Sequence, residues 1–439
     1  MISRLLATLT LVGLAAISLH AASPASHWVA SWTGSAQGPY PTGNASAQPN
    51  LSLIFPNAGD GARDQSFRLI IRPDVWGPEA RIRLSNVFGT MPVTFDGVFV
   101  GTQMSGAALI PGTNRAAAFR GKSAVTIPPG EFAWSDPIHL PVANPSQLAG
   151  RKLAVSFHIA GSSGPMTWHA KALTTSYLSA GPGSGSKGAE QGEASFPSPT
   201  TSWYFLDAVE MILPATTHTI VAFGDSITDG TASTLNGDDR WPDVLSRRLH
   251  KAYGNQFSVV NAGIGGNQIV GPATHTALAP FSGGPSALQR LERDVLKIAG
   301  VAAVIWLEGI NDFSRNGNAS ADSVKAGMKE GVARMRARIP GIRIIGATVT
   351  SAVGSAGGTP EQEEKRKILN EFIRTSGLFD GVADFDKATL DPATGGLRAE
   401  FVPESTTGGA GDKLHPNRLG YMAMGMAIDL DSLKPQHPR

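Results

Sequence analysis

Three residues of this sequence have the side-chain types that turn an alcohol into a nucleophile: Ser226, His415 and Asp412. Ser226 follows an apolar run in "VAFGDSITDG" (221–230), and Asp412 and His415 lie three residues apart in "GDKLHPN" (411–417). A serine hydroxyl needs a neighbouring imidazole to remove its proton, and the imidazole needs an acid that fixes its tautomer. Residues at i and i+3 can share one face of a turn, so the acid and the imidazole can be held together locally. The three residue types therefore fit acyl transfer.

Acyl transfer also requires hydrogen-bond donors for the negative oxygen of the tetrahedral intermediate. Two further segments can supply them, namely "NAGIGGNQ" (261–268) and "EGIND" (308–312). The backbone N–H of Ser226, a glycine N–H from "GIGG" and the side-chain amide of Asn311 are the three candidate donors.

Each motif taken alone also has an ordinary structural interpretation. A serine after a strand, such as Ser226, is more often a helix cap than a nucleophile. "GIND" can be a simple turn, and "DKLHP" can be a solvated acid beside a histidine that caps a terminal helix. Their occurrence in this order, after successive apolar runs, favours the catalytic interpretation. Asp225 is expected to fix the turn at Ser226, and His275, in a Gly/Pro-rich loop expected to overhang the site, is the spare histidine candidate.

The composition gives no sign of a metal, a nucleotide or a nucleic-acid partner. The sequence has no H-E-x-x-H, calcium-loop or P-loop motif, and "GDSITDG" does not match the G-x-G-x-x-G of dinucleotide sites. With 37 basic and 35 acidic residues the formal net charge is only +2. The sequence contains no cysteine, which excludes disulfides, thiol catalysis and cysteine metal sites. We therefore expect no cofactor and no metal site.

The elements that must position the candidate residues alternate between strands and helices after about residue 215. Apolar runs typical of parallel strands buried on both faces are "TIVAFG", "FSVVNAG", "AAVIWLEG", "IRIIGATVT" and "GVADF". Between them lie helical patterns, including Trp241, Val244, Leu245 and Leu249. Another helix is expected to begin at a cap, a first-turn proline and a capping-box amide, supplied by Thr359, Pro360 and Gln362. Its buried apolar stripe is Ile368, Leu369, Phe372 and Ile373, and it is expected to end at Gly377. This predicts an α/β fold, a flavodoxin-like doubly wound parallel sheet of five strands, with the ligand beyond the carboxyl ends of the strands.

The preceding half has a different pattern. Short alternating stretches such as "ARIRLSNVFG" and "KLAVSFHIAG" recur between turns, which predicts an antiparallel β-sandwich. Residues 181–200 are rich in Gly, Ser and Pro and are expected to form an exposed loop. We expect domains at 25–214 and 215–435, and we expect the six tryptophans of the first domain to be core residues.

The first 22 residues have the features of an export signal. Arg4 precedes an apolar stretch that ends near Leu19, and small residues follow in "HAASPAS". The stretch is shorter than the about 20 residues that a membrane span needs. We therefore expect a signal peptide at 1–22, a secreted or periplasmic protein, and no stable membrane insertion.

The second half resembles the SGNH subgroup of the GDSL esterase/lipase family. The resemblance lies in four blocks, "FGDSIT", "NAGIGG", "GIND" and "DKLHP", and covers roughly residues 218–430. It implies Ser226 as nucleophile, His415 as general base, Asp412 as its partner, and Ser226, Gly266 and Asn311 in the oxyanion hole. The one departure is Ile227, where the family has leucine. The first half is similar, more loosely, to the β-rich extension of some exported bacterial members.

These observations predict a secreted serine esterase that acts on esters of short acyl groups, including O-acetyl groups on carbohydrates. The short-acyl prediction depends on the small, polar residues of the loops "GPATHTALAPFSGGP" and "TSAVGSAGGTP". The expected partner is a small-molecule or polysaccharide ester. Two alternatives stay open, a lipase or lysophospholipase and a non-catalytic glycan-binding protein with the same fold. No oligomeric state is predicted.

Overall fold

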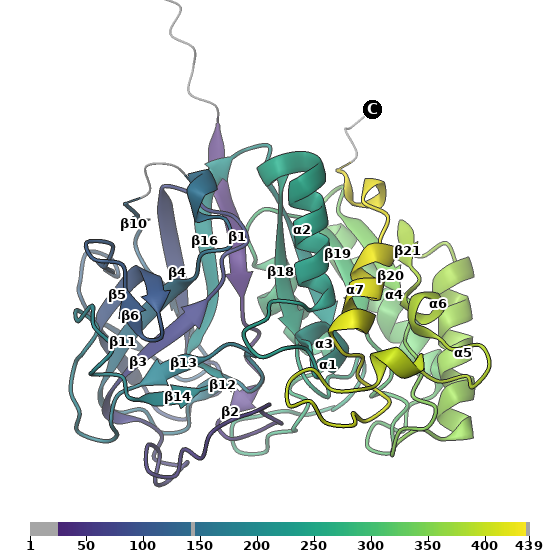
Figure 1. Ribbon diagram of the computed structural model, residues 1–439, viewed down its shortest axis with the longest axis horizontal. Coiled ribbons are helices and arrows are strands. Elements are labelled where there is room, and N and C mark those ends of the chain that lie inside the picture. The colour runs from purple at the N-terminus through teal and green to yellow at the C-terminus, as the bar shows by residue number, and fades with distance from the viewer. Residues whose placement is uncertain (1–24, 142–144, 436–439) are drawn as a thin grey trace, which may run out of the picture.

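The computed structural model describes residues 25–141 and 145–435, which form a β-rich part followed by an α/β part (Figure 1). The predicted signal peptide, residues 1–22, lies outside the described residues. A search of the described residues for a membrane-spanning helix finds none of sufficient length and apolar character.

The α/β part contains a parallel sheet whose five strands, within the described residues, have the order β18-β17-β19-β20-β21. Their bounds are β17 His218–Gly224, β18 Phe257–Gly263, β19 Val301–Leu307, β20 Arg343–Ala347 and β21 Gly381–Ala383. In chain order this is 2-1-3-4-5, with the switch point between the first and third strands. The prediction of five parallel strands is confirmed, although the last two strands are shorter than the apolar runs that indicated them.

Helices cover both faces of this sheet because successive strand residues point to opposite sides. Ile220 and Ala222 of β17 pack in the cluster that contains helices α2 and α7, whereas Val221 and Phe223 pack in the cluster that contains α4 and α5. The helices are α1 Ser226–Asp229, α2 Trp241–Tyr253, α3 Ala287–Leu291, α4 Ala321–Arg338, α5 Pro360–Thr375, α6 Phe385–Thr389 and α7 Arg418–Ala427. Short helical turns are η1 Pro145–Leu148, η2 Gly254–Gln256, η3 Glu292–Leu296, η4 Ala399–Phe401 and η5 Asp431–Leu433.

Helix α5 corrects two details of the sequence prediction. Thr359 caps its first turn by accepting from the Gln362 N–H, but the Gln362 side chain donates to the carbonyl of Ile310 and so does not close a capping box. Leu369 and Ile373 are buried as predicted, whereas Ile368 is 41% exposed. The side chain of Gln362 thereby ties the first turn of α5 to Ile310, the residue before Asn311.

The β-rich part contains antiparallel pairs arranged in three sheets within the described residues. The largest has the order β14-β13-β3-β11-β5-β6 with β7 and β8 paired to β5, the second has β1-β16-β4-β10 with β9 paired to β4, and the third has β15-β12-β2. Strand bounds are β1 Ser26–Thr33, β2 Gly38–Pro39, β3 Arg63–Ile71, β4 Glu79–Ser85, β5 Val93–Ser105, β6 Ala108–Leu109, β7 Arg115–Ala116, β8 Val125–Ile127, β9 Phe132–Trp134, β10 Ile138–His139, β11 Leu153–Ser162, β12 Thr167–His169, β13 Ser176–Leu178, β14 Ser198–Thr200, β15 Trp203–Tyr204 and β16 Leu206–Pro214. Side chains of all three sheets share one core, which includes Phe67, Phe157 and Tyr204.

Two expectations about the β-rich part need correction. Trp28 and Trp134 are only partly buried, and the guanidinium of Arg81 lies over both rings. Trp134 packs against a core cluster of the α/β part as a partly buried neighbour, so neither ring is fully buried as predicted. The 181–200 segment is not simply exposed, because Phe196 is 2% exposed beneath Arg68. Arg68 also donates to main-chain carbonyls of this segment, which holds it against the sheet.

The two parts are joined along strands β1 and β18, which lie side by side (Figure 1). Ser258 donates to the carbonyl of Ala30 and Thr33 donates to the carbonyl of Asn261, both at 2.7 Å. Ala30 itself belongs to one core cluster of the α/β part. The β-rich part therefore packs directly against the end strand of the parallel sheet.

Candidate active site

Ser226 is the first residue of helix α1, at the carboxyl end of β17. Gly224 is required before it, since a Cβ there would lie 2.3 Å from the carbonyl oxygen of Leu307. The cap of the helix is Asp225, whose carboxylate accepts from the Ile227 N–H at 2.9 Å. Gly230, at φ 105°, ends the helix after one turn. Capping is therefore done by Asp225, and the hydroxyl of Ser226 does not serve the helix.

The hydroxyl of Ser226 contacts His415 instead. His415 Nε2 lies 2.8 Å from Ser226 Oγ, and His415 Nδ1 lies 2.5 Å from Asp412 Oδ2. Asp412 and His415 lie in the segment before α7, and His415 is 189 residues after the serine. Ser226 is 5% exposed and the His415 side chain 13%, so their contact is largely shielded from solvent.

Asp412 is held as a carboxylate by local donors. Its Oδ1 accepts from the backbone N–H groups of Leu414 and His415, each at 2.9 Å. Burial acts to raise the pKa of Asp412, but the hydrogen bond and charge of His415 and these backbone N–H groups outweigh it and hold the pKa below its usual range. The positive φ of Lys413, 61°, gives the segment the turn that brings acid and imidazole together.

The three candidate oxyanion donors face little competition for their hydrogens from other acceptors. Among the residues that the structure describes, no acceptor is within hydrogen-bond range of the N–H groups of Ser226 and Gly266. The N–H of the neighbouring Gly265, by contrast, donates to Asp229 Oδ2 at 3.1 Å. Asn311 Nδ2 donates one hydrogen to the carbonyl of Asn267 at 3.0 Å, and the second hydrogen of the amide is free for another acceptor.

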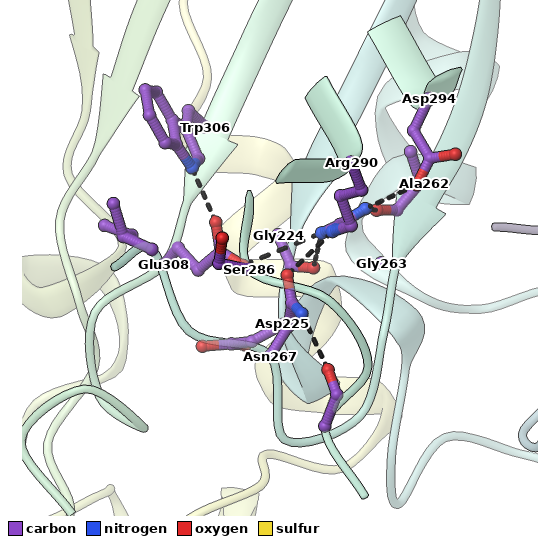
Figure 2. A network of polar contacts seen from close by, with 12 residues as sticks. Gly224, Asp225, Ala262, Gly263, Asn267, Ser286, Arg290, Asp294, Trp306 and Glu308 are labelled. Carbon is purple, nitrogen blue, oxygen red and sulfur yellow. Dashed lines mark hydrogen bonds and ion pairs between the residues drawn. The ribbon is translucent and has the colours of Figure 1, made fainter. Parts of the chain in front are cut away.

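A buried arginine that the sequence analysis did not identify ties these segments together (Figure 2). Arg290, on α3, is 1% exposed. It donates to the carbonyls of Gly224 (2.8 Å) and Ala262 (2.7 Å) and to Oδ1 of Asn267 (2.7 Å). These acceptors follow or end β17 and β18, so one guanidinium fixes the loops that carry the serine and the glycines. An arginine inside the apolar pattern "SALQRLERDVL" (286–296) is the signal that could have indicated it.

The charge of Arg290 is balanced by buried acids. Asp294 Oδ2 lies 3.1 Å from Nη1 and Glu308 Oε1 lies 3.6 Å from Nη2, while the Trp306 indole donates to Glu308 Oε2 (Figure 2). Burial raises the pKa of Glu308. The guanidinium also lies over the ring of Phe223, 4.2 Å from its centre. The side chains of Arg290, Asp294 and Glu308 are at most 2% exposed, so this network is enclosed within the protein.

Two further buried carboxyl groups, those of Asp225 and Asp312, also have a raised pKa. Burial raises the pKa of Asp225 well above its usual value, and the charges of Glu308 and Asp312 add to the effect. Burial likewise raises the pKa of Asp312 to about 7, although its carboxylate accepts from the N–H groups of Ile269 and Val270. Asp312 thereby links the "GIND" segment to the glycine loop.

His275 does not join the serine. Its Nδ1 accepts from the Phe281 N–H at 3.0 Å and its ring packs edge-on against Phe88 of the β-rich part. Burial, together with the charge of Arg293, lowers the pKa of His275 to about 4. The described residues also include no cluster of three or more His, Cys, Asp or Glu arranged to hold a metal ion.

Residues 222–423 match the model of the GDSL-like Lipase/Acylhydrolase family. The chain is similar to a lipase/acylhydrolase from Enterococcus faecalis, with 24% identity, 51% of this chain and 100% of that chain covered, and a TM-score of 0.36. It is similar to a carbohydrate acetylesterase family member from Sinorhizobium meliloti, with 19% identity, 48% and 95% covered, and a TM-score of 0.36. It is also similar to an M. Smegmatis aryl esterase, with 17% identity, 50% and 100% covered, and a TM-score of 0.37. No curated protein sequence matches the chain.

Proposed function

We propose a serine-esterase mechanism for this chain, which belongs through residues 222–423 to the GDSL-like lipase/acylhydrolase family and is a carboxylic ester hydrolase. The observation that carries the proposal is the continuous contact from Asp412 through His415 to Ser226 Oγ. In it the imidazole has one nitrogen facing a carboxylate and the other facing an alcohol, which is the arrangement that general-base activation requires.

Acylation begins when Ser226 Oγ attacks the ester carbonyl while His415 Nε2 takes the hydroxyl proton. The tetrahedral intermediate then breaks its bond to the alkoxy oxygen, and His415 returns the proton to this leaving group, so that an alcohol departs and an acyl-serine remains. Water attacks the acyl-serine with His415 again as base. The carboxylic acid leaves and the hydroxyl of Ser226 is restored.

The intermediate's oxygen is stabilised by donors that exist before the reaction. We assign this role to the N–H groups of Ser226 and Gly266 and to the Asn311 amide. Gly266 is preferred to Gly265 because the Gly265 N–H is already bonded to Asp229. Donors fixed in advance need no reorganisation when the charge develops, which makes them effective in a shielded site.

Asp412 acts as the partner of the base. Its lowered pKa keeps it ionised at neutral pH. As an acceptor-only carboxylate it holds the proton on Nδ1 and leaves Nε2 free to receive the serine proton. The negative charge of the Asp412 carboxylate also offsets the positive charge that His415 carries in the transition state.

The proposed substrates are esters of short acyl groups, among them O-acetyl groups on carbohydrates. The support is the composition of two loops after the strands, residues 271–285 and 350–360, which are rich in small and polar side chains. We further propose export by the signal peptide at 1–22 and two domains, an antiparallel β-sandwich at 25–214 and the catalytic domain at 215–435.

The test of the mechanism is the Ser226→Ala variant assayed on an aryl acetate. We expect kcat to fall by about 10⁴- to 10⁶-fold with an unchanged melting temperature. The control is Ser246→Ala, since Ser246 is a similarly buried serine whose hydroxyl donates to Asp74 and not to His415. Turnover that survives in Ser226→Ala would remove the nucleophile assignment.

The test of the substrate class is the release of acid from acetylated glycans, aryl esters and phospholipids under one set of conditions. We expect kcat/KM to be highest for acetyl esters and to fall as the acyl chain lengthens. A preference for phospholipids would contradict the short-acyl proposal and leave the serine mechanism intact.

A further inference from the structure

The glycine loop that carries Gly266 is held by a glutamine from the β-rich part of the chain. Gln37 follows β1, and its side chain is 1% exposed. Its Nε2 donates to the carbonyl of Gly265 at 3.2 Å and to the carbonyl of Ser282 at 2.5 Å. The two acceptors lie 228 and 245 residues further along the chain, so the contact exists only in the folded protein.

The position of Gln37 is itself well fixed. Its backbone N–H donates to the carbonyl of Trp168 at 2.8 Å. Gly43, at φ 105°, leaves the space that the side chain fills, since a Cβ there would lie 2.4 Å from Gln37 Nε2. The amide therefore approaches the glycine loop from a rigid support.

The carbonyl that Gln37 binds belongs to the same peptide group as the N–H of Gly266. A trans peptide is planar, and its C=O and N–H point in opposite directions. A hydrogen bond that fixes the Gly265 carbonyl toward Gln37 consequently fixes the Gly266 N–H away from it. Polarisation of the peptide by the same bond strengthens the N–H as a donor.

The other side of Gly265 is held from the β-rich part as well. The Gly265 N–H donates to Asp229 Oδ2 at 3.1 Å, and Asp229 Oδ1 lies 3.1 Å from His169 Nε2. His169 Nδ1 lies 2.9 Å from the carbonyl of Ser35. Asp229 and His169 are 2% and 4% exposed, so this chain of contacts is enclosed. Both polar groups of Gly265 are thus anchored, and the loop cannot turn its next peptide freely.

We propose that Gln37 is a positioning residue of the oxyanion hole, which orients the Gly266 N–H through the Gly265 carbonyl and makes the β-rich part an integral component of the catalytic unit. The inference rests on the proposed serine-esterase function. The Gln37 amide is expected to affect the stabilisation of the transition-state oxygen and not the binding of the substrate.

The experiment compares Gln37→Met with Gln65→Met in the full chain, with an aryl acetate as substrate. Methionine keeps the volume of the side chain and removes both hydrogens of the amide. Gln65 is the matched control, because it is also 1% exposed, lies in the β-rich part, and donates to a main-chain carbonyl, that of Ile54 at 3.0 Å. Melting temperatures of both variants report the common cost of losing a buried amide.

For Gln37→Met we expect kcat to fall by about 10- to 100-fold with KM within about twofold, the pattern of a lost transition-state interaction. For Gln65→Met we expect both constants to stay within about twofold despite a similar loss of thermal stability. A kcat of Gln37→Met within threefold of wild type, or a rise in KM that accounts for the whole loss, would overturn the inference.

The Ser226→Ala variant distinguishes a failure of the proposed serine mechanism from a failure of the positioning role of Gln37. If Ser226→Ala is inactive and Gln37→Met retains wild-type kcat, the mechanism stands and the positioning role of Gln37 is wrong. If Ser226→Ala retains turnover, the proposed function itself is wrong, whatever Gln37→Met does.

Discussion

Replacement of Asp412 by asparagine probes the base without removing a side chain. In the structure Asp412 Oδ1 accepts from two backbone N–H groups at 2.9 Å, and Oδ2 faces His415 Nδ1 at 2.5 Å. The asparagine oxygen can keep the backbone contacts, which turns its NH₂ group toward Nδ1. His415 must then accept at Nδ1 and carry its proton on Nε2, 2.8 Å from Ser226 Oγ, where it cannot take the serine proton.

We expect this change of tautomer to lower kcat by about 10⁴-fold, the cost of the same replacement in a Ser-His-Asp enzyme. The assay is initial-rate hydrolysis of an aryl acetate near pH 7.5, with the melting temperature measured on the same samples. Asp391→Asn is the control, because Asp391 also accepts from a backbone N–H (Ala393, 2.9 Å) and from a side chain (Thr394, 2.9 Å) but does not contact an imidazole. Asp412→Asn with more than a tenth of wild-type kcat and an unchanged melting temperature would show that the His415 tautomer is not set by Asp412.

Three further predictions concern the oxyanion donors and the buried charges. Asn311→Ala should lower kcat by about 10²- to 10³-fold with little change in KM, and a loss below threefold on an aryl acetate would exclude the amide as a donor. Arg290→Met should lower the free energy of unfolding by about 3–5 kcal/mol in urea, because Asp294 and Glu308 lose their buried counter-charge, and a loss under about 1 kcal/mol would contradict this. Asp312 has a pKa of about 7, above the about 3.9 of an unfolded aspartate, so the folded state binds more protons between these values and its stability falls as pH rises through them. The melting temperature of Asp312→Asn relative to wild type should therefore rise between pH 5 and pH 8, and a pH-independent difference would contradict the assignment.

The parallel sheet could be predicted because each of its strands has its own signal in the local sequence. Strands such as Val301–Leu307 are buried on both faces, and each needs an unbroken apolar run that is visible in the sequence. Helix α5 shows the limit of this reasoning. Its first turn was predicted from Thr359 and Pro360, but the Gln362 side chain bonds Ile310 in place of its own helix. The Gln362 side chain can bond either its own helix or a distant segment, and the sequence does not reveal which of these two partners it takes.

In the candidate site, too, residues with a local sequence signal can be predicted and residues that depend on a tertiary contact cannot. The sequence predicts Ser226, Asp412 and His415 because each lies in a short motif after an apolar run or next to its partner. Gln37 could not be found, since nothing near it in the sequence marks it as different from other glutamines of the β-rich part. Its role arises from a contact with Gly265 that only the packing of β1 beside β18 creates. The four-block resemblance already implies Gly266 as the donor, and the hydrogen bond from the Gly265 N–H to Asp229 adds a physical reason to prefer it.

Covalent labelling reports whether His415 makes the Ser226 hydroxyl a nucleophile. The folded protein is treated with an aryl phosphonate, which reacts with activated serines, and the modified peptide is identified by mass spectrometry. We expect a single adduct on Ser226, formed in parallel with the loss of esterase activity and absent from His415→Ala. Activity lost with an adduct on a different residue, or an active protein whose Ser226 stays unmodified, would contradict it.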